Sequence, residues 1–284
     1  MKRFVKKPAR LVLNRLGLEV VPRRVNVPTP TTPLGHPFDA NYRHGDIAFE
    51  VPLEKCMYPY HFSYSPAGWH PFVQVLRQYG ANPDLNYENS SLYAYYQAYQ
   101  PDTVLEAFFV DTETRTEFAS SKLADFKIPP HQPFFPWDPH ASETAAEKGL
   151  DASQGNQGYG PVSDAKGTLE FERLTHTYES IKTHGFKTGL GHDGDVRGYF
   201  LKSDDDYRFV IRQGLHRTAV LSAMDYEKIR VRFFDPYPRT IFLNDLDNWP
   251  QVKEGTVSTT LAKRIFNLFF EDDGCAKAEA LGLL

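Results

Sequence analysis

The sequence predicts an α/β fold, with the clearest signal in the second half of the chain. Residues 207–213, YRFVIRQ, alternate apolar and polar side chains as a strand does, and residues 228–234, KIRVRFF, alternate in the same way. Between them, Gly214 precedes a helical stretch that is rich in small residues. A strand, a tight turn, a helix and a second strand make an α/β unit.

Composition limits the class of protein. The 284 residues suit one large domain or two modest ones, and 41% hydrophobic with 24% charged residues is ordinary for a soluble globular chain. The net charge of -4 argues against a general nucleic-acid binder, although a local basic patch stays open. Cys56 and Cys275 lie far apart in the sequence, so they make neither a disulfide framework nor a zinc set. We expect a cytoplasmic protein.

Residues 1–30 are expected to form a basic arm. Leucines at helical spacing among lysines and arginines predict an amphipathic helix over residues 1–21. This helix either lies on an anionic membrane surface, as a peripheral contact, or packs on the body as a solvated arm. No run of about 18 apolar residues exists, so we expect no membrane-spanning segment.

Residues 31–150 are expected to form an aromatic-rich and proline-rich mixed α/β region. The pattern predicts a strand at 47–51, a helix at 72–79 and a second helix that starts at Asn89 or Ser90. The second helix carries an apolar stripe that is either a core face or the wall of a ligand groove, formed by Leu92, Tyr95, Tyr96 and Tyr99.

Prolines and aromatic residues after Ile128 predict a rigid loop. Phe134, Phe135 and Trp137 lie between the prolines. The loop either packs on the domain as a lid or forms the wall of a pocket, and the residues favour neither reading.

Residues 151–284 are expected to form the second domain. A stretch rich in Gly, Ser and Asn at 151–167 marks its start, and the helix that follows ends near Gly185. Residues 187–206 hold several short-turn signals and are expected to connect elements. A final amphipathic helix is expected within 256–274.

The glycine turn ahead of residue 215 is the candidate binding site. Gly214 permits a positive φ and lets a ligand approach the backbone closely, and the first turn of the next helix offers N–H groups and the positive end of its dipole. Such features bind phosphate oxygens. Arg217 adds forked donors, His216 can donate or accept a proton, and Thr218 supplies a hydroxyl. Alternatively, Gly214 only makes the turn and Arg217 pairs with a surface carboxylate.

The stretch GLHRTAVLSAM, residues 214–224, resembles the Gly-x-His-Arg-x-x-A box of the ParB/sulfiredoxin superfamily. Residues 174–186, LTHTYESIKTHGF, are similar to the family's helix before its first core strand, and residues 225–233, DYEKIRVRF, to the segment after the box. The resemblance covers about residues 168–235 and implies a compact ParB/sulfiredoxin-like domain in the C-terminal half. It also implies that nucleotide phosphates bind at Gly214, Leu215, His216, Arg217 and Thr218.

Departures from the family pattern narrow the expected chemistry. Sulfiredoxins place their catalytic cysteine where this chain has Leu215, which argues against cysteine chemistry. ParB proteins carry an arginine-rich box and a helix-turn-helix domain after it, whereas this chain has His216 and one visible helix after residue 234, so a ParB-type DNA-associated CTPase is the least favoured reading. The box is most similar to that of the kinases of small hydroxylated molecules.

Phosphoryl transfer needs a phosphate clamp, usually a divalent metal, and a base for the acceptor hydroxyl. Asp193 and Asp195, in the glycine-flanked GHDGDVRG, are candidate Mg²⁺ ligands, or else they cap turns. The kinase branch implies a glutamate base near the preceding helix, which makes Glu179 a candidate, although it also fits a solvated helix position. His192 and His216 are the other catalytic candidates.

Two functions from different classes follow. The first is a nucleotide-dependent phosphotransferase that uses ATP, ADP or CTP with Mg²⁺ on a hydroxylated small molecule or a sugar-like group. The second is a non-catalytic nucleotide-binding partner in bacterial envelope polysaccharide assembly, because the basic opening segment is similar to the starts of proteins from surface-polysaccharide gene clusters. We expect no nucleic-acid partner for either.

Overall fold

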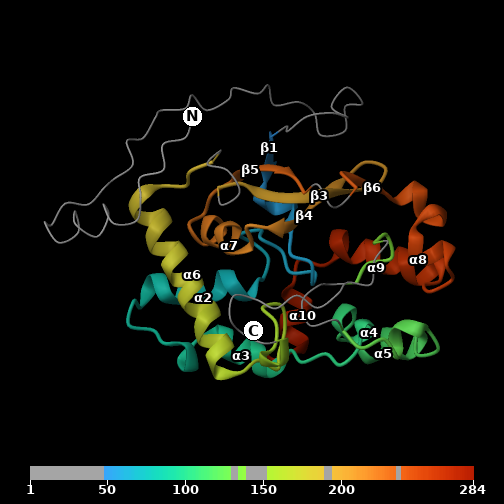
Figure 1. The fold of residues 1–284 in the computed structure, drawn as a ribbon, viewed down its shortest axis with the longest axis horizontal. Coiled ribbons are helices and arrows are strands. Elements are labelled where there is room, and N and C mark those ends of the chain that lie inside the picture. The colour runs from blue at the N-terminus through green and yellow to red at the C-terminus, as the bar shows by residue number, and fades with distance from the viewer. Residues whose placement is uncertain (1–47, 129–133, 139–151, 189–193, 235–237) are drawn as a thin grey trace, which may run out of the picture. The chain divides into compact units, whose positions relative to one another are not determined.

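A mixed sheet lies at the centre of the part of the chain that the computed structural model describes, residues 48–128, 134–138, 152–188, 194–234 and 238–284 (Figure 1). Its strand order is β1-β5-β3-β4-β2, and β6 also pairs with β3. The strands are β1 (Ala48–Pro52), β2 (Cys56–Met57), β3 (Val196–Lys202), β4 (Tyr207–Gln213), β5 (Lys228–Phe233) and β6 (Thr240–Phe242). With helices around this sheet, the α/β prediction is confirmed.

The described helices that frame the sheet vary from one turn to almost six. They are α2 (Pro71–Ala81), α3 (Ser91–Ala98), α4 (Val104–Phe108), α5 (Thr112–Glu117), α6 (Asp164–His184), α7 (Leu215–Ala223), α8 (Pro250–Lys253), α9 (Thr259–Glu271) and α10 (Cys275–Ala280). Two helix ends that the sequence predicted show the expected cap chemistry. The Ser90 side chain accepts from the Tyr93 N–H at the start of α3, and α6 ends at Gly185 with a φ of 70°.

Strands from both halves of the chain share this sheet. β3 and β4 form an antiparallel hairpin, and β5 runs parallel to β3, so the connection through α7 passes over β3. β1 pairs antiparallel with β5, placing Phe49 opposite Val231, and β2 pairs parallel with β4. The first two strands therefore form both ends of the strand order.

The contacts group the described residues into one compact unit. Residues 31–150 and 151–284 were expected to be separate regions, and strands from both lie side by side in one sheet. The expected arm, residues 1–30, lies outside the described residues. Among the helices that the structure does describe, none has the length and apolar character needed to cross a bilayer.

The strand β3 corrects the sequence interpretation. Residues 187–206 were expected to be a connector because of their turn signals, yet β3 lies at the centre of the sheet. Gly198 was one of those signals. A side chain there would clash with the Val210 carbonyl on β4, and a register irregularity lies between Arg197 and Gly198. Gly198 thus marks close strand contact rather than a turn.

One face of the sheet is covered by α2, α3, α6 and α7. Tyr207, Phe209 and Ile211 of β4 all point into this first core, as their alternation predicted. The helices contribute buried side chains to it, among them Phe72, Tyr95, Leu174 and Val220. The tyrosine stripe is therefore a core face: Tyr95 Oη donates to Gly158 O at 2.5 Å and Tyr96 Oη donates to Gln157 O at 3.0 Å.

The other face packs against α4, α9 and three aromatic residues of the segment 134–138, Phe134, Phe135 and Trp137. Val210 of β4, Tyr199 of β3 and Phe269 of α9 belong to this second core. The Trp137 ring stacks on Phe135 at 5.0 Å, and its Nε1 donates to Tyr199 Oη at 3.2 Å. These aromatic residues are buried against the domain, which favours the packed-lid reading.

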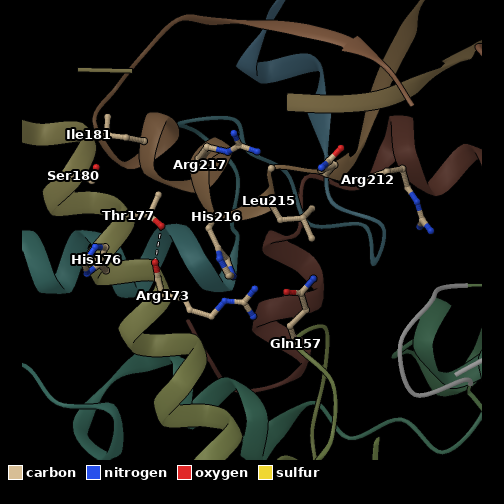
Figure 2. A pocket seen from close by; sticks show the side chains of 12 residues that line it. Gln157, Arg173, His176, Thr177, Ser180, Ile181, Arg212, Leu215, His216 and Arg217 are labelled. Carbon is tan, nitrogen blue, oxygen red and sulfur yellow. Dashed lines mark hydrogen bonds between the residues drawn. The ribbon is translucent and has the colours of Figure 1, made fainter. Parts of the chain in front are cut away.

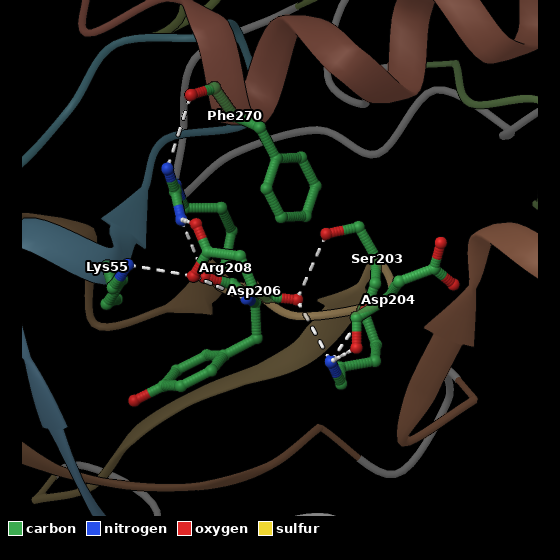
Figure 3. A network of polar contacts seen from close by, with 8 residues as sticks. Lys55, Ser203, Asp204, Asp206, Arg208 and Phe270 are labelled. Atoms are coloured by element: carbon green, nitrogen blue, oxygen red, sulfur yellow. Dashed lines mark hydrogen bonds and ion pairs between the residues drawn. The ribbon is translucent and has the colours of Figure 1, made fainter.

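A polar network closes the β3–β4 hairpin (Figure 3). Asp206 Oδ1 lies 2.8 Å from Lys55 Nζ, and Asp206 Oδ2 lies 2.5 Å from Arg208 Nη1. Arg208 in turn donates to the Phe270 carbonyl at 3.2 Å. The network ties the hairpin to the segment before β2 and to the end of α9.

Candidate functional site

A cavity of about 510 Å³ lies between α6 and the turn from β4 to α7 (Figure 2). Residues 212–217 form its floor, and one face of α6 forms its wall. Gln157 comes from the loop before α6. The glycine turn that the sequence selected is therefore part of a cavity.

Gly214 begins α7 in the left-handed conformation, with a φ of 90°. No side chain caps this helix, so no residue at the cap position occupies the donors of its first turn. A Cβ at residue 214 would lie 3.1 Å from both Arg217 Nη2 and Val196 Cγ2. The backbone conformation favours glycine here, and the close packing leaves little room for a Cβ.

Arg217 folds back over this turn. Its Nη2 donates to the Asp195 carbonyl at 3.1 Å, and the residue lines the cavity. The guanidinium thus lies at the positive end of α7 rather than away from it. Forked donors beside a helix N-terminus match the oxygens of a phosphate.

Basic side chains from three elements surround the cavity. Arg212 comes from β4, Arg217 and His216 from α7, and Arg173 and His176 from α6 (Figure 2). None of the described residues that line this cavity is acidic. An anionic ligand is what such a lining attracts.

Behind this lining lies a buried carboxylate, Glu170, with no exposed side-chain surface. Its Oε1 lies 3.0 Å from Lys166 Nζ and 2.7 Å from Arg173 Nη1. Its Oε2 lies 3.0 Å from His216 Nε2. Glu170 therefore joins two residues of the cavity wall, Arg173 and His216, through one anchored group.

The charge state of Glu170 follows from these contacts. Burial alone would raise the pKa of Glu170. The contact with His216 and the positive charges of His216, Lys166 and Arg173 outweigh this effect and lower the pKa from 4.5 to about 2. Glu170 is ionised at neutral pH. It holds the basic residues of the wall in place rather than acting as a proton acceptor.

The structure brings together most of the predicted binding residues. Gly214, Leu215, His216 and Arg217 line the cavity. Thr218 is fully buried, and its hydroxyl donates to the Gly214 carbonyl at 3.0 Å, so it supports the turn from behind.

The predicted catalytic and metal residues are placed differently. Glu179 lies on α6, half-buried, and is not among the described lining residues of this cavity. His192 and Asp193 lie outside the described residues. The Asp195 carboxylate is 3.0 Å from Arg232 Nε and 3.9 Å from Arg197 Nη2. A buried carboxylate that already faces two arginines does not fit a Mg²⁺ ligand, and no cluster of metal-binding side chains occurs within the described ranges.

A second cavity of about 330 Å³ adjoins the first. The two share Arg173, His176, Thr177 and His216, and Leu169 and Glu172 line only the second. The shared residues form a wall that both cavities contact.

The sequence interpretation missed the contribution of α6. Glu170, Arg173 and His176 recur every three residues, and Thr177 follows Arg173 by four, so they share one helical face. This spacing was a usable signal, but the sequence analysis selected only Glu179 from this helix. The sequence did not indicate a role for Arg212, because the alternation within its strand does not show which segments pack near the end of that strand.

Comparison with protein-family models, with curated proteins and with solved structures finds no match to this chain.

Proposed function

We propose that the cavity binds the phosphate groups of a nucleotide, and that the protein is a nucleotide-dependent phosphotransferase acting on a hydroxylated small molecule or a sugar-like group. The observation that supports this most is that Arg173, Arg212 and Arg217 line one cavity together with the uncapped start of α7. A polyphosphate is a compact anion with oxygens for several forked donors. Membership of the ParB/sulfiredoxin superfamily is part of the same proposal, resting on the Gly-x-His-Arg box.

Each group has a part in the proposed binding. The N–H groups of the first turn of α7 and the Arg217 guanidinium would hold the terminal phosphate, and Arg173 would contact it from α6. Glu170 keeps Arg173 and His216 in place by its contacts at 2.7 Å and 3.0 Å. Since the Asp195 carboxylate faces arginines, no step is assigned to Mg²⁺ at that residue.

The test is nucleotide affinity in Arg217→Gln, measured by calorimetry with ATP, ADP and CTP, each with and without Mg²⁺. Losing a charge-assisted contact costs about 1.5–3 kcal/mol, so we expect affinity to fall by about tenfold to a hundredfold. Arg264→Gln is the matched control, because Arg264 is 45% exposed on α9 and pairs with Glu271. Equal affinity in the two variants would contradict the proposal.

A second candidate is a nucleotide-binding partner without turnover, acting in envelope polysaccharide assembly. The engaged Asp195 carboxylate favours it, because the metal ligand that the sequence suggested there is occupied by Arg232. Release of ADP or phosphate during incubation with ATP and candidate hydroxylated acceptors separates the two functions. Thermal stabilisation by nucleotide without any release would support the partner function.

A further inference from the structure

His216 occupies a special place in the cavity wall. It lines both the larger and the smaller cavity, so a group attached to its ring could be reached from either. Its ring packs edge-on against Phe72 of α2 with centroids 5.5 Å apart. The imidazole is therefore held between a core aromatic ring and the two cavities.

The two nitrogens of this imidazole have different surroundings. Nε2 is buried and lies 3.0 Å from Glu170 Oε2, a close contact without hydrogen-bond geometry, and 15% of the side chain is exposed. Because Nε2 is buried, Nδ1 is the ring nitrogen left for a ligand in the cavity.

The carboxylate faces one nitrogen of the ring. Glu170 Oε2 lies 3.0 Å from Nε2, and Lys166 and Arg173 pair with the other carboxylate oxygen. In the tautomer that has its proton on Nε2, the lone pair is on Nδ1. A carboxylate that orients an imidazole in this way is the arrangement that prepares a histidine for nucleophilic attack.

Arginines line the same cavity as that nitrogen. Arg173 lies on one side and Arg217 with the start of α7 on the other (Figure 2). These donors would stabilise the equatorial oxygens of a phosphoryl group as it moves between two partners.

We propose that His216 accepts a phosphoryl group on Nδ1 and holds it as a covalent intermediate. The inference rests on the proposed nucleotide binding, and it adds a reaction in two steps, with the acceptor entering from the smaller cavity.

The bonds balance without an additional reactant. The Nδ1 lone pair forms the N–P bond to the terminal phosphorus of a nucleoside triphosphate, and the P–O bond to the nucleoside diphosphate breaks with its electron pair on the leaving oxygen. The Nε2 proton stays beside Glu170, whose negative charge balances the charge that the ring gains. A hydroxyl oxygen of the acceptor then attacks the phosphorus, the N–P bond returns its electron pair to Nδ1, and the hydroxyl proton passes to water.

The experiment incubates the full chain with ATP or CTP labelled at the γ-phosphate, and separately with phosphoramidate, a donor that lacks a nucleoside. Label on histidine is lost in acid and survives alkali, unlike label on serine or threonine. His216→Asn is compared with His184→Asn, an exposed histidine at the end of α6 whose Nδ1 lies 3.1 Å from Ser180 O. Nucleotide binding to each variant is measured by thermal shift.

We expect acid-labile label on the natural chain and on His184→Asn, and none on His216→Asn. In Glu170→Gln, at saturating nucleotide and with the rate corrected for the folded fraction measured by circular dichroism, we expect labelling at least tenfold slower. Nucleotide binding without label, acid-stable label, or label retained in His216→Asn would overturn the inference while nucleotide binding stands. Labelling of His216 by phosphoramidate without nucleotide binding would keep the nucleophile and overturn the nucleotide proposal. Absence of both would overturn both.

Discussion

Of the single side chains in the candidate site, Glu170 is expected to have the largest effect on the stability of the fold. Its carboxylate has no exposed surface, and the Lys166 side chain beside it is 1% exposed. Two ions removed from water are tolerated only as partners, because each compensates the desolvation of the other.

Glu170→Gln is therefore expected to destabilise the protein. The change leaves Lys166 buried with an amide in place of a carboxylate, and breaking a buried pair in this way costs about 3–5 kcal/mol. Urea unfolding at pH 7 measures it, with Glu172→Gln, an exposed glutamate on the same helix, as the control. A cost below about 1 kcal/mol would show that the network adds little to stability.

The same carboxylate predicts a pH dependence. The pKa of Glu170 is about 2 in the folded protein against 4.5 for the ordinary carboxyl. Folding thus favours the ionised form, so its contribution is complete above about pH 4.5 and is lost as the pH falls toward 2.

We expect the stability difference between the natural chain and Glu170→Gln to shrink by about 1.4 kcal/mol between pH 7 and pH 3.5, one unit below the unfolded pKa. Urea unfolding at both pH values tests this. A difference that is constant or grows toward low pH would contradict the assigned charge state.

At the scale of elements, the β4–α7 turn joins the fold to the site. Gly214 combines a positive φ with a Cβ position that Val196 and Arg217 already approach to 3.1 Å, whereas Gly185 at the end of α6 has a positive φ and nothing within 4 Å of its Cβ position. Substitutions at these two glycines therefore distinguish the effect of backbone strain from the effect of steric contact.

Gly185→Ala is expected to cost about 1–3 kcal/mol of stability, because a φ of 70° with a ψ of 164° lies in a region that almost only glycine adopts, and to leave nucleotide affinity unchanged. Gly214→Ala is expected to cost more, and also to weaken nucleotide binding at least tenfold, because its Cβ displaces the Arg217 guanidinium. Thermal unfolding and calorimetry measure the two effects. Equal stability and equal affinity in the two variants would show that contact at residue 214 is unimportant.

Local patterns predicted several of the elements. The core sides of β4 and α9, the start of α3 at Ser90 and the end of α6 at Gly185 follow from apolar spacing and cap chemistry. β3 was missed because its glycine, Gly198, reads as a turn until a neighbouring strand is present. α10 was missed because its six residues are too short to show a period.

At the scale of the molecule, the described parts of the two halves depend on one another. β1 and β2 lie at the two ends of the strand order, next to β5 and β4. From the other end of the chain, Lys277 Nζ on α10 donates to the Tyr60 carbonyl at 3.1 Å and to the Ala107 carbonyl at 2.8 Å. Its burial lowers its pKa to about 7.

Separate fragments 32–150 and 151–284 are accordingly expected not to fold alone. Without β1 and β2, the edges of β5 and β4 are uncovered and both cores lose apolar partners such as Phe49 and Met57. Circular dichroism and proton NMR of each fragment test this, with the chain from residue 32 to 284 as the control. Dispersed NMR signals and cooperative unfolding of 151–284 alone would establish it as an independent domain.

The local sequence predicted only some of the residues that form the cavity. The glycine turn and the cation behind it, Gly214 and Arg217, are neighbours in the chain, so their chemistry could be read from spacing. Arg173 and Glu170 reach the same place only because α6 packs beside α7 in the folded chain. The Asp195 carboxylate is likewise engaged by Arg232, a residue of β5 that is 37 positions away in the printed sequence, at 3.0 Å. Local propensity and capping act within a few residues, whereas charge pairing and cavity shape depend on which distant segments packing brings together.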